Sequence, residues 1–155
     1  MTFRIRGLAP QPFQPLFALT DEALAEQGIR RCIADVSPGY PDRIELRDAE
    51  PGESLLLLNY VHQPAETPYR ASHAIFVLEG ATQRFDREGE IPPALRRRLL
   101  SLRAFDDADL LVDAEVVHGR EVEPVIERLL ENPLAQYLHA HYAKPGCYAA
   151  RIDRA

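Results

Sequence analysis

The chain has 155 residues, of which 46% are apolar and 27% are charged; this composition is typical of a folded domain and excludes a disordered or fibrous protein. At this length folding buries about two-thirds of the surface of the unfolded chain, so residues 1–155 are expected to form a single domain. The formal net charge of −6 argues against nucleic acid and against anionic membranes as partners, because the average field of the protein repels both.

Signals for export and membrane insertion are missing from the sequence. No apolar stretch approaches the roughly 20 residues that cross a bilayer, and the first residues, MTFRIRGLAPQPF, lack the apolar core of a signal peptide. Cys32 and Cys147 are too few for a disulfide framework and have no CxxC spacing. We therefore expect a cytoplasmic protein with two free thiols.

Short strands and proline-rich turns alternate in the first third of the chain. FRIRGL, at residues 3–8, predicts a strand, and the prolines of 10–15 predict an extended segment. Residues 20–28 predict a short helix that Thr20 caps and Gly28 ends. Residues 29–35 and the alternating segment RIELR, at 43–47, predict two further strands.

The middle of the chain contains the clearest β signals. SLLLLNYVH, at 54–62, has the continuous apolar character of a central strand that is buried on both faces. SHAIFVLE, at 72–79, is the next strand, and a loop at 63–71 connects the two.

The last third predicts a helix start at 92–100, a hairpin over 100–117 and a second helix at 123–132. The second helix has one apolar stripe at Val122, Val125, Ile126, Leu129 and Leu130. Residues 136–143 and 147–153 predict a terminal hairpin, although the first arm could instead extend the helical region. The sum is an α+β fold, a mostly antiparallel sheet with two or three packed helices.

The sequence offers one candidate ligand site near the long hairpin. Antiparallel pairing of 54–62 with 72–79 would bring Asn59, Tyr60 and His62 near Arg70 and His73. Arginine offers a planar fork for an anion, and histidine exchanges protons near neutral pH, so a small anionic ligand is expected at Asn59, His62, Arg70 and His73. The simpler alternative is a solvated rim in which Arg70 forms an ordinary ion pair and His73 is half-buried.

A second candidate site is a metal site at His139 and His141. On a strand these residues share one face and lie about 7 Å apart along the chain, so both rings can reach one ion. A third ligand is required, and Cys147, His118 and a distant carboxylate all remain candidates. The alternative is a pair of surface or interfacial histidines without a metal; on a helix the two rings would diverge.

Arg96, Arg97 and Arg98 form the only basic run. Consecutive residues of a helix are rotated by about 100°, so these side chains are expected to spread over a solvated face instead of forming a phosphate site. The sequence also lacks GxGxxG, GxxxxGK[ST], GxSxG and HExxH, so the usual motif arguments for common nucleotide-binding and hydrolytic functions do not apply.

From FRIRGL to the C-terminus the chain resembles domain-of-unknown-function family 1203, most clearly in DVSPGYPDRIELRDAEPGESLLLLNYVHQPAETPYRASHAIFV and in GCYAARIDRA. In that family a cysteine often stands between the proline and arginine of PGYPDR; the corresponding residue here is Asp42, so thiol chemistry at that position is not expected. The resemblance implies a small bacterial cytoplasmic domain and brings no established activity and no catalytic residues.

The function is therefore unknown from the sequence, and whether the protein is an enzyme stays open. The preferred interpretation is a protein that binds or acts on a small anionic ligand near residues 59–73. The alternative is a non-catalytic interaction module, such as a homodimer that pairs through exposed strand edges.

Overall fold

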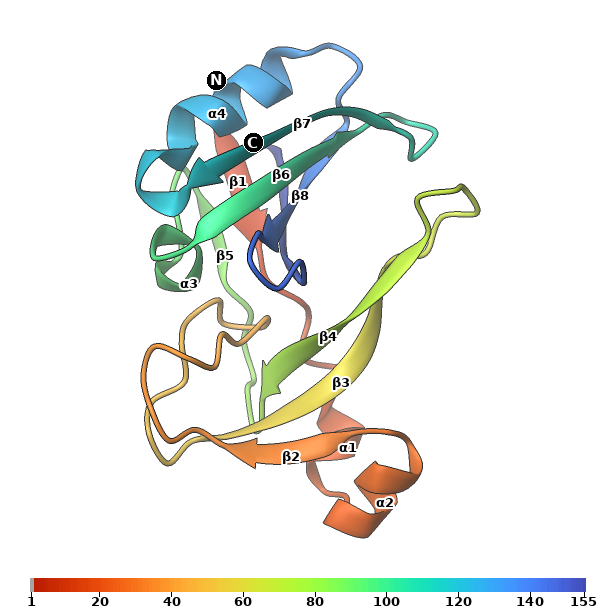
Figure 1. Cartoon of the computed structure of the whole chain (residues 1–155), viewed down its shortest axis with the longest axis vertical. Helices are drawn as coiled ribbons and strands as arrows, with labels where there is room; N and C mark the ends of the chain where they lie inside the picture. The colour runs from red at the N-terminus through yellow and green to blue at the C-terminus, as the bar shows by residue number, and fades with distance from the viewer. Residues whose placement is uncertain (1) are drawn as a thin grey trace.

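Two antiparallel sheets form the framework of the computed structural model, which describes residues 2–155 (Figure 1). The first has six strands in the order β5-β1-β9-β8-β6-β7, and the second has three in the order β2-β3-β4. The strands are β1 (Phe3–Arg6), β2 (Arg30–Ile33), β3 (Ser54–Gln63), β4 (Ala71–Leu78), β5 (Asp86–Glu88), β6 (Leu99–Phe105), β7 (Leu111–His118), β8 (Tyr137–Tyr142) and β9 (Tyr148–Arg154). The expected mostly antiparallel α+β class is confirmed.

Four α-helices occur in the described part of the chain, one or two more than expected: α1 (Gln14–Phe17), α2 (Asp21–Glu26), α3 (Pro93–Arg96) and α4 (Val122–Glu131). The Thr20 side chain accepts a hydrogen bond from the Ala23 amide at the start of α2, and Gly28 follows the helix with a φ of 73°. None of the helices formed by residues 2–155 is both long and apolar enough to span a bilayer.

Each sheet has its own apolar core. Helix α4 inserts Ile126, Leu129 and Leu130 into the core of the six-stranded sheet, as its apolar stripe predicts. Helix α2 contributes Leu24 to the core of the three-stranded sheet. The terminal hairpin is β8 paired with β9, so the alternative of a longer helical region is wrong.

Two local predictions are also wrong. Residues 43–47 form turns instead of a strand, because Leu46 adopts a left-handed backbone conformation with φ of 55° while Ile44 and Leu46 are both fully buried. The segment 10–15 is not extended throughout, since Gln14 and Pro15 begin α1. Proline is tolerated there because the amide of a first-turn residue has no partner within the helix.

Strands β3 and β4 pair antiparallel in the expected way, with β3 central in its sheet. Tyr60 lies opposite His73, and the register shifts between Val61 and Gln63. His62 is the extra residue of this bulge. The bulge matters for the site, because His62 and Gln63, which a regular strand would direct to opposite faces, both contact residues of β8.

Candidate functional site

Three histidines from the two sheets meet at one point. His62 comes from β3 of the three-stranded sheet, whereas His139 and His141 come from β8 of the six-stranded sheet. One ring nitrogen of each lies within 4.8 Å of a ring nitrogen of the other two. Tetrahedral zinc with bonds of about 2.0–2.1 Å holds its ligand nitrogens about 3.4 Å apart, so small side-chain rotations would bring the three nitrogens to bonding distance. We call these residues the histidine triad.

Each ring of the triad presents a nitrogen that lacks a hydrogen bond. His62 Nδ1, His139 Nδ1 and His141 Nε2 are all buried, and no residue between 2 and 155 provides a partner for them. Buried polar atoms without partners are rare, since each costs about 1–3 kcal/mol. The three nitrogens belong to one small cluster, so a single ligand or ordered water molecules can satisfy them.

The tautomer of His141 is set by its second ring nitrogen. His141 Nδ1 lies 3.0 Å from the carbonyl oxygen of Gly146 and donates to it, which leaves Nε2 with a free lone pair. Metal-bound histidines almost always donate their other ring N–H in this way. The Gly146 carbonyl, in the turn between β8 and β9, thus leaves His141 Nε2 as the ring nitrogen that can accept a bond.

The triad is uncharged at neutral pH. Burial lowers the pKa of His62 and of His141 to about 4 and that of His139 to about 3. The positive charge of Arg103 acts in the same direction on all three rings, while the Gly146 carbonyl partly opposes the shift at His141. Neutral imidazole is the form that binds metals.

Aromatic rings enclose the triad. The ring of Tyr148 stacks on His62 with centroids 5.3 Å apart and meets His139 edge-on at 5.1 Å. Beside it, the Gln63 amide donates to Tyr137 Oη at 2.9 Å, and Tyr137 donates to the carboxylate of Asp109 at 2.5 Å. These contacts hold β3 against β8.

Arg103 is a cation beside the triad. It lies directly opposite His139 on the neighbouring strand β6, so the two side chains share a face of the sheet. Its Nε donates to Ser101 Oγ at 3.3 Å, and it forms no ion pair within the described residues. Burial lowers the pKa of Arg103. A half-buried guanidinium without a carboxylate is suited to hold an anion near the triad.

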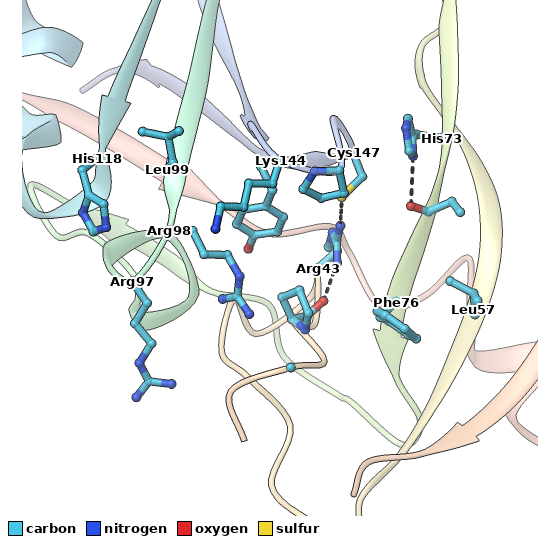
Figure 2. Close-up of a pocket in the computed structure, with 15 residues that line it drawn as sticks. Arg43, Leu57, His73, Phe76, Arg97, Arg98, Leu99, His118, Lys144 and Cys147 are labelled. Carbon is cyan, nitrogen blue, oxygen red and sulfur yellow. Dashed lines mark hydrogen bonds between the residues drawn. The ribbon is translucent and has the colours of Figure 1, made fainter. Parts of the chain in front are cut away.

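A large cavity of about 660 Å³ is lined by Lys144 and Cys147 of the β8–β9 turn (Figure 2). Arg43 donates from Nη2 to Cys147 Sγ at 2.9 Å on its wall. Arg97 and Arg98 also reach it, and both pair with the buried Asp48, at 3.2 and 2.6 Å. The prediction that these arginines lie on a solvated face is therefore wrong for Arg98, which is half-buried. Arg96 does not pair with Asp48 but forms an ion pair with Glu123.

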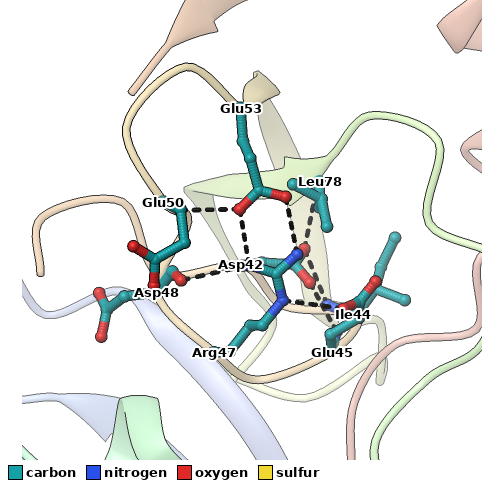
Figure 3. A network of polar contacts seen from close by, with 8 residues as sticks. All are labelled: Asp42, Ile44, Glu45, Arg47, Asp48, Glu50, Glu53 and Leu78. Atoms are coloured by element: carbon teal, nitrogen blue, oxygen red, sulfur yellow. Dashed lines mark hydrogen bonds and ion pairs between the residues drawn. The ribbon is translucent and has the colours of Figure 1, made fainter. Parts of the chain in front are cut away.

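The loop that carries Arg43 is held by a polar network (Figure 3). The fully buried carboxylate of Asp42 accepts hydrogen bonds from the amides of Ile44, Glu45 and Leu78 at 3.1, 2.5 and 2.7 Å. Burial raises the pKa of Asp42, and these three bonds oppose the rise. In the same network Arg47 binds both oxygens of Glu53, at 2.7 and 2.8 Å.

The residues predicted for the anionic-ligand site do not form one cluster. Asn59 is exposed and lines a different, smaller pocket. Arg70 is exposed at the hairpin tip, where it donates to the Pro64 carbonyl. His73 is half-buried and lines the large cavity, close enough to His62 to lower its pKa. His62 contacts His141 and Tyr148 on the strands that flank the β8–β9 turn, and His73 lines the large cavity together with Lys144 of that turn.

The predicted metal pair lies together, with His62 as the third member instead of the candidates Cys147 and His118. His139 and His141 are 4% and 1% exposed, so the interpretation as surface histidines is wrong. Arg103 and Arg43 were not anticipated. Arg103 could have been found from its place in the predicted strand before the 106–109 turn; for Arg43 the sequence carries no signal.

Neither a curated protein nor a solved structure matches the chain. A family described as "Protein of unknown function (DUF1203)" matches residues 39–154, a range that includes the histidine triad, Arg103 and the residues of the large cavity. Since the match covers more than half of the sequence, the chain belongs to the DUF1203 family.

Proposed function

We propose that the protein binds one divalent transition-metal ion through the histidine triad and offers the remaining coordination position to a small ligand. The observation that carries this proposal is the meeting of three histidines that each offer one ring nitrogen within 4.8 Å of the others. Each of these rings also has one buried nitrogen without a hydrogen-bond partner among residues 2–155. Imidazole nitrogens suit zinc, copper, nickel and iron, and we take zinc as the first metal to test.

Three protein ligands with one open position are typical of catalytic zinc sites, whereas structural zinc sites are closed by four. Zinc in such a site lowers the pKa of coordinated water to about 7. Arg103 would orient an anionic group beside the ion, because it faces His139 and has no carboxylate partner in the described chain. Hydrolysis or hydration of a small anionic substrate is the reaction class that this arrangement supports best. A cytoplasmic location, expected from the sequence, is compatible with the free state of Cys32 and Cys147.

Zinc titration of chelator-treated protein tests the proposal. We expect calorimetry to show one zinc ion per chain for the unmodified protein, and loss of that binding in His62→Ala and His139→Ala. His118→Ala is the matched control, since His118 lies outside the triad and should leave the stoichiometry unchanged.

Cobalt gives a second readout, because its visible absorption depends on the geometry of its ligands. The unmodified protein and His118→Ala should give the same cobalt spectrum, and His62→Ala should not. The proposal is wrong if neither zinc, cobalt, nickel nor copper binds stoichiometrically, or if His62→Ala and His118→Ala bind zinc equally well.

A further inference from the structure

The large cavity is formed by both sheets but does not include the histidine triad. Leu57 and Phe76 line it from the three-stranded sheet, and Leu99, Tyr142 and Cys147 line it from the six-stranded sheet and its last turn (Figure 2). Its volume of about 660 Å³ is ample for a small organic molecule.

Positive charge is concentrated on the wall of this cavity in a protein whose formal net charge is −6. The basic residues that line it are Arg43, His73, Arg97, Arg98, His118 and Lys144. The carboxylate of Asp48 pairs with Arg97 and Arg98. Arg43 and Lys144 form no ion pair within residues 2–155, so the four permanent cations face a single carboxylate.

Arg43 is the most unusual of these residues, because its side chain is 1% exposed and all of its acceptors are uncharged. It donates to the carbonyl oxygens of Tyr148 and Pro41 at 2.8 and 2.6 Å and to Cys147 Sγ at 2.9 Å. A buried charge without an opposite charge is costly. A bound anion would supply that charge.

Tyr142 adds an independent observation. Its hydroxyl is buried and has no hydrogen-bond partner in the part of the chain that the structure describes, and its ring lines the cavity. The guanidinium groups of Arg43 and Arg98 lie over this ring, at 5.0 and 5.1 Å from its centroid. The cavity thus combines unpaired cations, a free hydroxyl donor and apolar walls.

We propose that this cavity binds a small organic anion, with a carboxylate or phosphate head group near Arg43, Lys144 and Tyr142 and an aromatic or aliphatic body between Leu57, Phe76 and Leu99. The site is separate from the proposed metal site, so it is tested on chelator-treated protein. His62→Ala, which removes a triad residue, should leave anion binding unchanged; failure of the metal proposal would therefore not affect this result.

Lys144 allows a direct test, because it is the only lysine in the sequence and is exposed at the rim of the cavity. An acetylating reagent with mass spectrometry of the Lys144 peptide reports its accessibility. Phenyl phosphate or benzoate should protect Lys144 in a saturable way, and neutral benzamide should not. Comparison of the two anions shows which head group the cavity prefers.

Calorimetry with the better anion completes the test. Lys144→Ala should weaken binding about fivefold to tenfold, the loss typical of one charge-assisted contact. Arg30→Ala removes the same charge from an exposed site outside the cavity and should change the affinity by less than about twofold. Absence of saturable binding by both anions, equal binding of benzamide, or equal effects of the two variants would overturn the proposal.

Discussion

The imidazole rings of the triad should make the stability of the metal-free protein depend on pH. Burial lowers the pKa of His62 and His141 to about 4 and that of His139 to about 3, against an ordinary value of 6.5. At pH values between the lowered pKa and 6.5, each of these histidines binds a proton in the unfolded chain but not in the folded chain. The free energy of unfolding is therefore expected to fall as the pH decreases from 6.5 towards 4, by about 1.4 kcal/mol per pH unit for each proton taken up.

Urea unfolding of metal-free protein at several pH values measures this slope. His139→Leu removes one ring whose pKa is lowered by burial and should therefore flatten the dependence. Equal slopes for the unmodified protein and His139→Leu would show that His139 takes up its proton in the folded state as readily as in the unfolded chain.

At the scale of elements, the loop between β2 and β3 depends on the side chain of Asp42. Its Oδ1 accepts the amides of Ile44 and Leu78, so it ties the loop to the end of β4, and its Oδ2 accepts the amide of Glu45. Asp42→Ala leaves these donors without partners and should lower the free energy of unfolding by about 3 kcal/mol or more. Asp42→Asn keeps one oxygen acceptor and should cost less.

Urea denaturation of Asp42→Ala and Asp42→Asn measures the loss in the free energy of unfolding for each variant. A loss of less than about 1 kcal/mol in Asp42→Ala would mean that water satisfies the three amides and that the carboxylate does not hold the loop.

The same loop shows why some elements could not be predicted from the sequence. The alternation of Ile44 and Leu46 is also that of a strand, but the Asp42 carboxylate captures the amides that a sheet would pair. In contrast, β3, β4 and α4 bury continuous or periodic apolar residues along their own length, so their local pattern was sufficient. The bulge at His62 has no local signature and was missed.

The candidate site, too, could be predicted from the sequence only where it depends on local structure. His139 and His141 form a pair through strand periodicity alone, which the sequence contains. The third ring belongs to a strand about 80 residues earlier in the chain, and only the docking of one sheet against the other selects His62 over Cys147 or His118.

At the scale of the whole molecule, a metal in the triad would cross-link the two sheets. His62 belongs to the three-stranded sheet and the other two ligands to the six-stranded sheet, so separating the sheets would require breaking a metal bond. Zinc at 100 times its dissociation constant should stabilise the folded chain by about 2.7 kcal/mol. In hydrogen exchange, the added protection should extend over β3 and β8 together, since both strands carry ligands.

His62→Ala distinguishes this cross-link from zinc binding by the pair on β8 alone. In that variant zinc should no longer protect β3, and any residual effect should be confined to β8, whose two histidines remain. His118→Ala should retain protection of both strands. If zinc protected β8 but left β3 unchanged in the unmodified protein, the ion would bind without His62, and the two sheets would be held together by their packed side chains alone.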